Sequence, residues 1–479
     1  MKKQSDSLVS KLGYGSADLY GGGAFLIISI LYLYFLTDIV GLSPLLAGSI
    51  PFIGRAWDAV SDPLMGRIVD RTRSRFGAKR LFLLFGSFIA GFTFFLLWLS
   101  IGGGEWVQYL YYLVTFIMFS TGFTIVMVPY NALLPDMIRD YHLRGQYTAI
   151  RMIFSALSAI LGGLLPDMIV NRFDGGEAGF AVMGGVFGVL FLVAILVTFT
   201  TTWERPEGNV RNAPEKWSAN LTVFKSRAFR YYLGIFLFGQ GSMDFIMALV
   251  MYFLTYVLFQ SGQYVLVMAG VLSSQLLAMF LYQALLKRHS KKLPAWIGFP
   301  IQAVASLAML FFAYEGAPMI PVVVLSFLIG FGTAAGTVTA FSILADMADV
   351  DELITTKRRA GLYSGMATFA RKVANGIALG LIGLALFLIG YDGSLDVQAP
   401  LAREGIKYMF ILMPVVFIAF TLFFVKKYPL TQEGFDVLQK AITDLKDGKD
   451  TLSEEEKRQC EAITGYAYDE LWSEDNAEL

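Results

Sequence analysis

Cysteine, histidine and charge are all scarce in this chain of 479 residues. Cys460 is the single cysteine, which excludes a disulfide within the chain and a cysteine-ligated metal cluster. The two histidines, His142 and His289, lie between the long apolar runs, so neither can relay protons inside a membrane. Charged residues make up only 16% of the chain, against about 25% in a typical soluble protein. This composition excludes a soluble multidomain protein.

Motifs for energy-driven and catalytic chemistry are missing as well. The phosphate-binding pattern G-x-x-x-x-G-K-[ST] does not occur, because Gly448-Lys449 is followed by Asp450. We therefore do not expect this chain alone to drive transport with ATP. No paired-carboxylate hydrolase pattern, Ser–His pattern or metal-ligand spacing is found, and we expect neither an enzyme nor a bound cofactor. The formal net charge is zero, which gives no signal for nucleic acid.

Apolar residues, in contrast, make up 56% of the chain and gather in long runs. Each run reaches about 20 residues, the length that crosses the hydrocarbon core of a bilayer as a helix. The 41 Phe and 47 Gly fit this class, since aromatics favour the lipid boundary and glycine favours close helix approach. The sequence predicts an all-α membrane protein with twelve transmembrane helices, at residues 17–38, 45–66, 81–101, 106–132, 146–170, 180–202, 232–258, 264–286, 294–314, 318–344, 361–389 and 405–425.

The basic residues are distributed unevenly between the connecting loops. Loops on one side of the predicted membrane hold fourteen lysines and arginines, while the opposite loops hold only Arg172 and Arg403. Because basic loops stay in the cytoplasm, both termini are expected there. Without a recognisable cleavage site after Lys2, Lys3 and Lys11, we expect a multi-pass protein of a bacterial cytoplasmic (inner) membrane.

The longest polar stretch between spans divides the chain into two sets of six helices. Tyr34-Phe35-Leu36-Thr37 resembles Tyr252-Phe253-Leu254-Thr255, and Leu134-Pro135-Asp136-Met137 resembles Leu344-Ala345-Asp346-Met347. Both matches place one half on the other in a similar register, which favours a parallel six-plus-six repeat. The predicted organisation is an N-terminal six-helix bundle, a central cytoplasmic loop, a C-terminal six-helix bundle and a cytoplasmic tail, at residues 1–203, 204–231, 232–425 and 426–479.

In the tail, the sequence predicts two helices that begin with threonine caps. Thr431 and Thr451 are the expected N-cap residues, and Thr451 is followed three positions later by Glu454, as in a capping box. Two roles are open for the tail, a regulatory or partner-binding segment and a simple solubilising terminus.

Two carboxylates in the second predicted span dominate the functional interpretation. Asp58 and Asp62 are four residues apart, so a helix places both on one face. Like charges at this spacing repel each other, and each costs about 2.5–3.5 kcal/mol or more at the bilayer centre. A bound cation or proton would relieve both costs, whereas a nearby arginine or lysine would make the pair structural. We favour a cation or proton site.

Further polar residues lie inside or beside apolar runs. Asp18, at the predicted start of the first span, can accept hydrogen bonds from substrate hydroxyls or can be an acid favoured by the helix dipole. Two roles are open for Arg151, which either grips the substrate or neutralises an aspartate. Thr124 offers a neutral oxygen for sodium or a packing hydroxyl, and Tyr130 offers a ring for sugar stacking or for core packing.

Charge pairing and gating are expected from a second group of residues. Arg371 and Lys372 lie well inside the eleventh predicted span, where such cations usually face a cavity and pair with acids. Lys372 is expected to hold the aspartate pair together when the cation has left. Asp70 and Arg75 belong to a basic loop that is most simply a topology signal and is also a candidate latch of the inner gate.

Several short motifs together resemble those of the glycoside–pentoside–hexuronide:cation symporters, a family of the major facilitator superfamily. The resemblance spans all twelve predicted helices and rests on Trp57-Asp58-Ala59-Val60-Ser61-Asp62-Pro63, Tyr14-Gly15-Ser16-Ala17-Asp18, Phe35-Leu36-Thr37-Asp38, Val128-Pro129-Tyr130, Ala345-Asp346-Met347-Ala348-Asp349 and Phe369-Ala370-Arg371-Lys372. It implies the major facilitator fold and Na⁺, Li⁺ or H⁺ coupled uptake of a glycoside. The implied cation site comprises Asp58 and Asp62, with Ser61 and Thr124 as neutral ligands of a metal ion such as Na⁺.

The resemblance also implies roles for other residues and has two departures. It places Asp18 and Arg151 at the sugar site and Lys372 near the cation. Melibiose-type members carry an acid and a tryptophan in the fourth span, and Met127 and Asn131 stand at those positions here. A galactoside of the melibiose type is therefore not expected, and an anionic substrate such as a uronide gains weight.

These observations predict a cation-coupled secondary symporter, driven by Na⁺ or H⁺, for a glycoside or related sugar. The implied substrate site contains Asp18, Arg151, Tyr130, Asn131 and Met127. A cation-coupled carrier of lysolipids or other amphipathic lipids is an alternative, which Met127 also suits. A non-transporting membrane sensor is a third possibility. The expected partners are a small-molecule substrate and the lipid bilayer, and the expected oligomeric state is a monomer.

Overall fold

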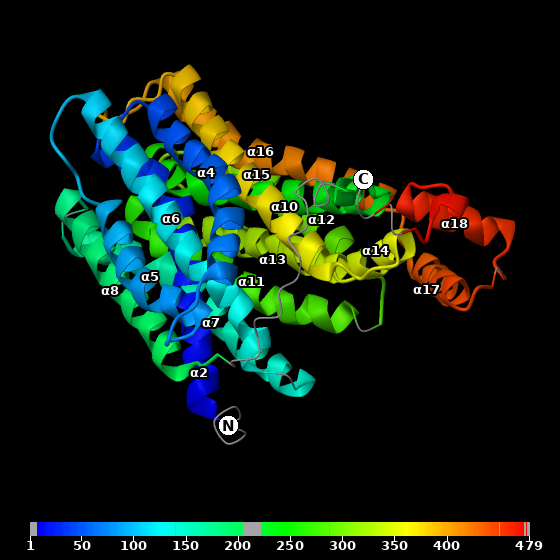
Figure 1. The fold of residues 1–479 in the computed structure, drawn as a ribbon. Helices are drawn as coiled ribbons and strands as arrows, with labels where there is room; N and C mark the ends of the chain where they lie inside the picture. The colour runs from blue at the N-terminus through cyan, green and yellow to red at the C-terminus, as the bar shows by residue number, and fades with distance from the viewer. Residues whose placement is uncertain are drawn as a thin grey trace.

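The computed structural model describes residues 7–138, 140–173, 175–204, 222–286, 288–449, 451–473 and 476. Within these ranges every regular element is a helix (Figure 1), which confirms the predicted all-α class. Most of the predicted central loop, residues 205–221, lies outside the described residues, as does the side chain of Asp70.

The helices before and after the central loop follow one another in two sets. The first set consists of α2 (Leu8–Ser16), α3 (Asp18–Ile27), the π-helical segments η1 (Ile28–Tyr32) and η2 (Phe35–Ile39), α4 (Pro44–Arg71), α5 (Ala78–Leu96), α6 (Glu105–Met137), α7 (Tyr141–Arg172) and α8 (Glu177–Thr201). The second set consists of α10 (Arg227–Tyr252), the π-helical segment η5 (Phe253–Val257), α11 (Tyr264–Leu286), α12 (Leu293–Ala308), η7 (Met309–Phe312), α13 (Met319–Leu344), α14 (Met347–Thr355), α15 (Ala360–Leu388) and α16 (Pro400–Lys427).

Eleven segments of the described chain are long and apolar enough to cross a membrane. Helix α4, the second predicted span, is not among them, because several charged side chains, including Arg55, Asp58 and Asp62, lie along it. Its 28 residues still exceed the roughly 20 that a spanning helix needs. The predicted start of the first span at residue 17 is wrong, since helical structure begins at Leu8 and the spanning segment runs to Tyr32.

Prolines shape α4. Pro44 opens the helix, where its missing N–H costs no hydrogen bond. Pro51 and Pro63 lie inside the helix and cannot donate to the carbonyl groups one turn earlier. The carbonyl of Ala59, four residues before Pro63, is thereby left without its helical donor. In sequence, this carbonyl lies between Asp58 and Asp62.

Glycines let α4 pack directly on α15. A Cβ added to Gly48 would lie 2.9 Å from the Cα of Gly383, and one added to Gly383 would lie 2.5 Å from the carbonyl oxygen of Pro44. A Cβ on Gly376 would lie 2.7 Å from the Cβ of Arg55. The two helices therefore meet backbone to backbone, which brings side chains of the two sets within hydrogen-bonding distance of each other.

The two sets share local features at matching places. The first pair of matched tetrapeptides, Tyr34-Phe35-Leu36-Thr37 and Tyr252-Phe253-Leu254-Thr255, runs into π-helical segments, which are η2 in the first set and η5 in the second. Lys79, at the start of α5, pairs with Asp136 of α6. Lys291, just before α12, pairs with Asp346 after α13 at 2.5 Å. The second sequence match, around Asp136 and Asp346, thus corresponds to equivalent ion pairs.

At one end of the molecule the two sets are joined by hydrogen bonds. Asp38, in η2, accepts hydrogen bonds from the hydroxyls of Tyr256 and, at 2.6 Å, Tyr391. The hydroxyls of Thr37 and Tyr252 lie 2.7 Å apart. Away from this end, the ribbons of the two sets diverge toward the N-terminus of α2 and toward the tail (Figure 1).

The chain after α16 forms α17 (Gln432–Lys446) and α18 (Glu454–Thr464). Thr431 caps α17 by accepting a hydrogen bond from the Gly434 N–H, which confirms that prediction. The prediction for Thr451 is wrong, because α18 begins two residues later than expected and Ser453 forms the capping box with Glu456. The sequence contains two overlapping capping-box patterns, and the structure uses the second.

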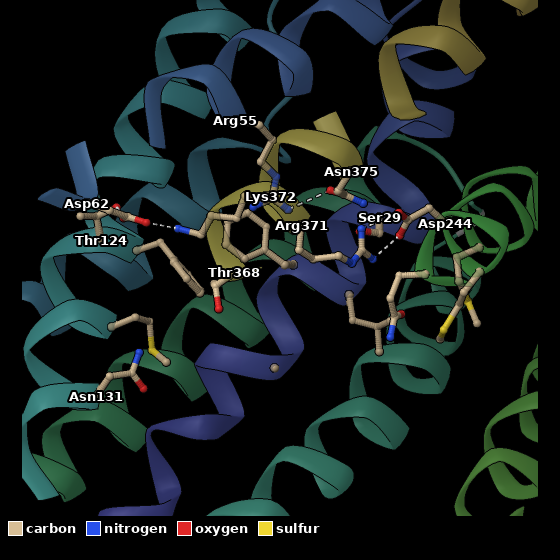
Figure 2. A pocket seen from close by; sticks show the side chains of 18 of the residues that line it. Ser29, Arg55, Asp62, Thr124, Asn131, Asp244, Thr368, Arg371, Lys372 and Asn375 are labelled. Atoms are coloured by element: carbon tan, nitrogen blue, oxygen red, sulfur yellow. Dashed lines mark hydrogen bonds and ion pairs between the residues drawn. The ribbon is translucent and has the colours of Figure 1, made fainter. Parts of the chain in front are cut away.

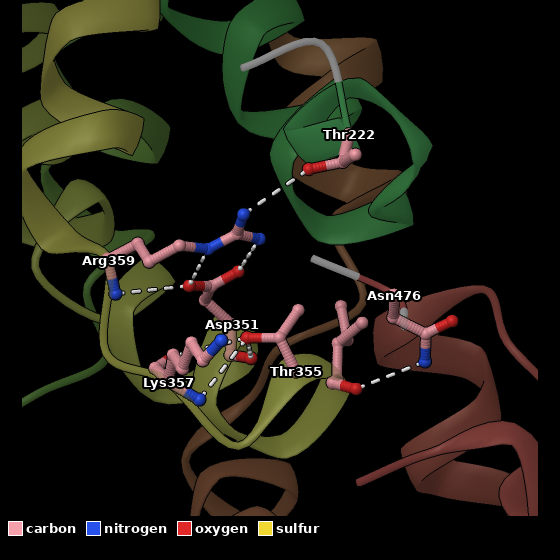
Figure 3. A network of polar contacts seen from close by, with 7 residues as sticks. Thr222, Asp351, Thr355, Lys357, Arg359 and Asn476 are labelled. Atoms are coloured by element: carbon pink, nitrogen blue, oxygen red, sulfur yellow. Dashed lines mark hydrogen bonds and ion pairs between the residues drawn. The ribbon is translucent and has the colours of Figure 1, made fainter. Parts of the chain in front are cut away.

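The end of the tail packs on α14. The backbone N–H of Trp472 donates to the carbonyl of Leu353 at 2.9 Å, and the Asn476 side chain donates to the carbonyl of Ile354 at 3.1 Å. Beside this contact, Arg359 grips the fully buried Asp351 through its backbone N–H, Nε and Nη2 (Figure 3). The tail is therefore docked on the second set of helices, just before the start of α15.

Candidate functional site

A cavity of about 480 Å³ lies between the two sets of helices. Its walls come from α3, η1, α4 and α6 on one side and from α10 and α15 on the other. The polar and charged side chains on these walls face one another across the cavity (Figure 2), and they are Ser29, Arg55, Asp62, Thr124, Asn131, Gln240, Asp244, Thr368, Arg371, Lys372 and Asn375.

The aspartate pair and Lys372 come together on one wall. The Nζ of Lys372 lies 2.6 Å from Asp62 Oδ2 and 3.7 Å from Asp58 Oδ2. The side chain of Asp58 is fully buried, whereas that of Asp62 is 31% exposed and lines the cavity. A lysine ammonium from α15 thus lies within ion-pair distance of both carboxylates of α4, in the position where a bound cation would relieve their repulsion.

Arg55 and Asn375 extend this cluster. Arg55 Nη1 lies 3.5 Å from Asp58 Oδ2, and its Nη2 donates to Asn375 Oδ1 at 3.0 Å. The guanidinium also lies over the ring of Phe25, 3.7 Å from the ring centroid. Two buried atoms of the cluster, Arg55 Nε and Asp58 Oδ1, have no hydrogen-bond partner. Both atoms are exceptions to the general pattern, because buried polar atoms in proteins nearly always have a hydrogen-bond partner.

Neutral oxygen atoms surround the carboxylates. The Thr124 hydroxyl donates to Asp62 Oδ1 at 2.7 Å and lies 3.3 Å from the Ser61 hydroxyl. The carbonyl of Ala59, released by Pro63, belongs to the same turn of α4. No cluster of three or more histidine, cysteine or acidic side chains occurs among the described residues. The donor set therefore suits an alkali cation or a proton, which need few charged ligands, rather than a transition metal.

A second acid–base pair lines the opposite wall. Arg371 of α15 binds Asp244 of α10 with both terminal nitrogens, at 2.6 and 2.7 Å. In Figure 2, Arg371 and Lys372 point in opposite directions, the first toward Asp244 and the second toward Asp62. The sequence interpretation did not single out Asp244. A lone aspartate inside the apolar run of the seventh predicted span is a signal that could have found it.

Asp18 and Arg151 also form a two-pronged ion pair. Arg151 Nε donates to Asp18 Oδ2 at 2.6 Å, and its Nη2 lies 3.2 Å from Asp18 Oδ1. Of the two roles considered for Arg151, this structure shows the one in which the arginine neutralises an aspartate. Neither residue belongs to the described lining of the cavity. Asn131 connects them to it, because its side-chain oxygen accepts a 2.7 Å hydrogen bond from Arg151 and also faces the cavity.

The other residues of the implied substrate site differ in their surroundings. Met127 lines the cavity. Tyr130 is fully buried, its hydroxyl donates to the carbonyl of Tyr14, and Arg151 lies 4.7 Å over its ring. The ring is therefore occupied by packing in this state and presents no free face for a sugar. Of the two gating candidates, Arg75 lies over the ring of Phe76, and the side chain of Asp70 lies outside the described residues.

Comparison with known proteins identifies the family. The profile of the family described as MFS/sugar transport protein matches residues 13–432. This chain belongs to that family. The predicted major facilitator fold is thereby confirmed, and the chain is a multi-pass membrane transporter rather than an enzyme.

The relatives include symporters whose names state two different substrates. The putative glycoside/cation symporter YagG of Escherichia coli (strain K12) is 26% identical, over 91% of this chain and 95% of the relative. The sodium-dependent lysophosphatidylcholine symporter 1 of Gallus gallus is 25% identical, over 90% of this chain and 88% of the relative. Among solved structures, a bacterial homologue of the human lysosomal transporter Spinster, inward-facing and unoccupied, has a TM-score of 0.64 at 13% identity, covering 93% of this chain and 98% of that chain. At this identity the likeness shows the fold alone.

Proposed function

We propose that this protein is a cation-coupled symporter that carries a glycoside or related sugar by alternating access. The observation that carries the proposal is the position of Lys372 between Asp58 and Asp62. When no coupling ion is bound, the ammonium of Lys372 supplies the positive charge that Na⁺ or H⁺ would otherwise bring to the two carboxylates. The symporter names of the relatives support the same class of transport.

The geometry gives the transport cycle a simple order. The incoming cation binds Asp58 and Asp62, with Ser61, Thr124 and the Ala59 carbonyl as neutral ligands, and displaces Lys372. The released ammonium is then available to the substrate in the same cavity, so cation and substrate each favour binding of the other. A typical coupling of this kind is about 1–3 kcal/mol, or 5–150-fold in affinity.

The substrate class has one serious alternative. The lining includes Phe25, Phe123, Met127, Met243 and Met247 beside its charged groups. Such an apolar wall also suits a lysolipid, and one relative is named as a symporter of lysophosphatidylcholine. A glycoside with an apolar aglycone and a lysolipid are both compatible with this wall. Transport measurements with each compound must therefore decide between them.

The proposed orientation places both termini in the cytoplasm of a bacterium. It follows from the basic loops of the sequence and puts the joined end around Asp38 outside. In this orientation the structure is closed to the outside, and the cavity belongs to an inward-facing state. The proposed boundaries at 203/204, 231/232 and 425/426 and the monomeric state complete this picture.

Uptake into proteoliposomes tests the proposal. With a glycoside as substrate, an inward Na⁺ or H⁺ gradient should drive accumulation, and Asp58→Asn or Asp62→Asn should abolish it. Asp392→Asn, in an exposed loop, is the matched control and should transport normally. Undiminished accumulation in either site variant would reject the cation site. Accumulation of lysophosphatidylcholine but not of the glycoside would select the alternative.

A further inference from the structure

The charged groups around the cavity cancel in the cation-free state. Three carboxylates (Asp58, Asp62 and Asp244) face three cations (Arg55, Arg371 and Lys372), and each acid lies within ion-pair distance of at least one of these bases. The neighbouring Asp18–Arg151 pair is neutral as well. The described site therefore carries no net charge before the coupling ion arrives.

Arrival of the coupling ion changes this count by one positive charge. The change is the same for Na⁺ between the aspartates and for a proton on Asp62. Lys372 then loses its 2.6 Å partner while it still faces the cavity. An uncompensated charge enclosed between helices in a membrane is strongly unfavourable. A neutral substrate would leave this charge in place when the cavity closes around it.

A carboxylate at position 127 would have cancelled the extra charge. Met127 lines the cavity, and no acid of the described lining replaces it, since Asp244 is fully used by Arg371. The guanidinium of Arg55 provides a second observation that favours an anionic ligand. Its Nε is buried on the cavity wall without a hydrogen-bond partner.

We propose that the substrate itself supplies the missing negative charge. The substrate is a monoanion whose carboxylate or phosphate is bound by Lys372 and the neighbouring guanidinium groups after the coupling ion has displaced Lys372 from Asp62. The remainder of the substrate is apolar or aromatic, because Phe25, Phe123 and the cavity methionines face it. This inference rests on the proposed symport and narrows its substrate class.

Matched pairs of ligands separate charge from shape. Phenyl β-D-glucuronide and phenyl β-D-glucoside share ring and aglycone, and only the first carries a carboxylate. Lysophosphatidylglycerol and lysophosphatidylcholine share the chain and phosphate, and only the first has a net negative charge. The first pair tests a carboxylate and the second a phosphate. Their dissociation constants are measured with the purified full-length protein, with and without Na⁺ and at neutral and acidic pH.

We expect the anionic member of one pair to bind at least about tenfold more tightly than its neutral partner when the coupling ion is present. Without the ion, this preference should disappear. Equal affinity for both members, with the cation still strengthening binding, would overturn the monoanion proposal and leave symport intact. Absence of any cation effect, or of any binding, would overturn the monoanion proposal together with its basis.

Variants that change the charge of the cavity provide a second test. Met127→Asp adds the missing carboxylate and should remove the preference for the anion, whereas the neutral Met127→Asn should keep it. Arg371→Gln leaves Asp244 unpaired and should also remove the preference. Combining Arg371→Gln with Asp244→Asn restores neutrality and should restore most of it. A preference that survives both Met127→Asp and Arg371→Gln would show that cavity charge does not select the substrate.

Discussion

At the scale of single residues, Lys372 takes part in two features of the structure. Its ammonium pairs with Asp62, and its side chain lines the cavity that we propose as the substrate site. The same ammonium cannot hold Asp62 and leave room for a cation. In the proposed cycle, competition for one carboxylate therefore couples the state of the cation site to the charge that the substrate meets.

Replacing Lys372 by methionine tests this competition. We expect Lys372→Met to strengthen Na⁺ binding by about tenfold or more, because a competing charge is removed. Return of the empty carrier should become slow, since Asp62 would then lack its ion-pair partner between the helices while Asp58 keeps Arg55. Na⁺-dependent thermal stability measures the first effect. Net uptake into proteoliposomes measures the second, and counterflow, which bypasses the empty carrier, should be spared. Lys407→Met, beside Glu404 on α16, is the control. Unchanged Na⁺ affinity would show that Lys372 does not compete with the ion.

The Asp18–Arg151 pair gives a second prediction for individual residues. Arg151→Gln should lower the free energy of unfolding by about 3 kcal/mol, because it leaves Asp18, a largely buried acid, without its partner. Asp18→Asn combined with Arg151→Gln should cost less than the two single changes together. Denaturation of the detergent-solubilised protein measures the cycle. Strictly additive costs would mean that the pair has no interaction energy.

At this scale the sequence predicted some contacts and missed others. Asp58 and Asp62 stand out because charge in an apolar run is costly, and Lys372 stands out for the same reason. That reasoning could not tell which cation pairs with which acid, since pairing depends on how α4 and α15 cross. Asp244 carries the same signal and was missed. The roles of all these residues stay predictions until they are tested.

At the scale of elements, the contact between α4 and α15 depends on glycine. Gly383→Ala should destabilise the present arrangement by about 1–3 kcal/mol, because the new Cβ would lie 2.5 Å from the Pro44 carbonyl oxygen. Gly66→Ala, on α4 with open space around it, is the control and should be neutral or slightly stabilising. The thermal midpoint of the purified protein measures both. A thermal midpoint of Gly383→Ala equal to that of the unmodified protein would mean that α4 and α15 can move apart at this position without loss of stability.

The start of α18 gives a prediction about pH. Hydrogen bonds from Lys440 and from the Ser453 cap lower the pKa of Glu456 from 4.5 to about 2. A lowered pKa means that the ionised form stabilises the folded tail at pH values above 4.5, and that this contribution is lost as the pH falls toward 2. The protection factors of the α18 amides, which are corrected for the pH dependence of intrinsic exchange, should fall over this range. Glu456→Gln should remove the pH dependence, and Glu455→Gln should leave it unchanged.

Helix existence was easier to predict than helix boundaries. Long apolar runs fix the number and order of the elements, because every backbone group in a membrane must be bonded within its own helix. The start at Leu8 was missed, since the residues before 17 mix polar and apolar types without a clear stop. The start of α18 was missed because two capping patterns compete and only tertiary packing selects one.

At the scale of the whole molecule, the hydrogen bonds around Asp38 hold one end shut. Asp38→Asn should weaken this closure, because an amide oxygen accepts hydrogen bonds from Tyr256 and Tyr391 less strongly than a carboxylate. An impermeant thiol reagent on the predicted outer side should then reach Ser29→Cys in the cavity several-fold faster. Cys460→Ser provides the cysteine-free background, and Asp392→Asn is the control. An unchanged labelling rate would mean that the closure does not depend on Asp38.

The docking of the tail has a practical consequence for following transport in real time. Trp472 and Asn476 are hydrogen-bonded to α14, so α17 and α18 must move as one body with the second set of helices. The position of the tail therefore reports the position of the second set of helices relative to the first. A fluorescent dye on α18 and another at Ser7, just before α2, would convert each opening and closing into a change of energy transfer, without a label inside a spanning segment.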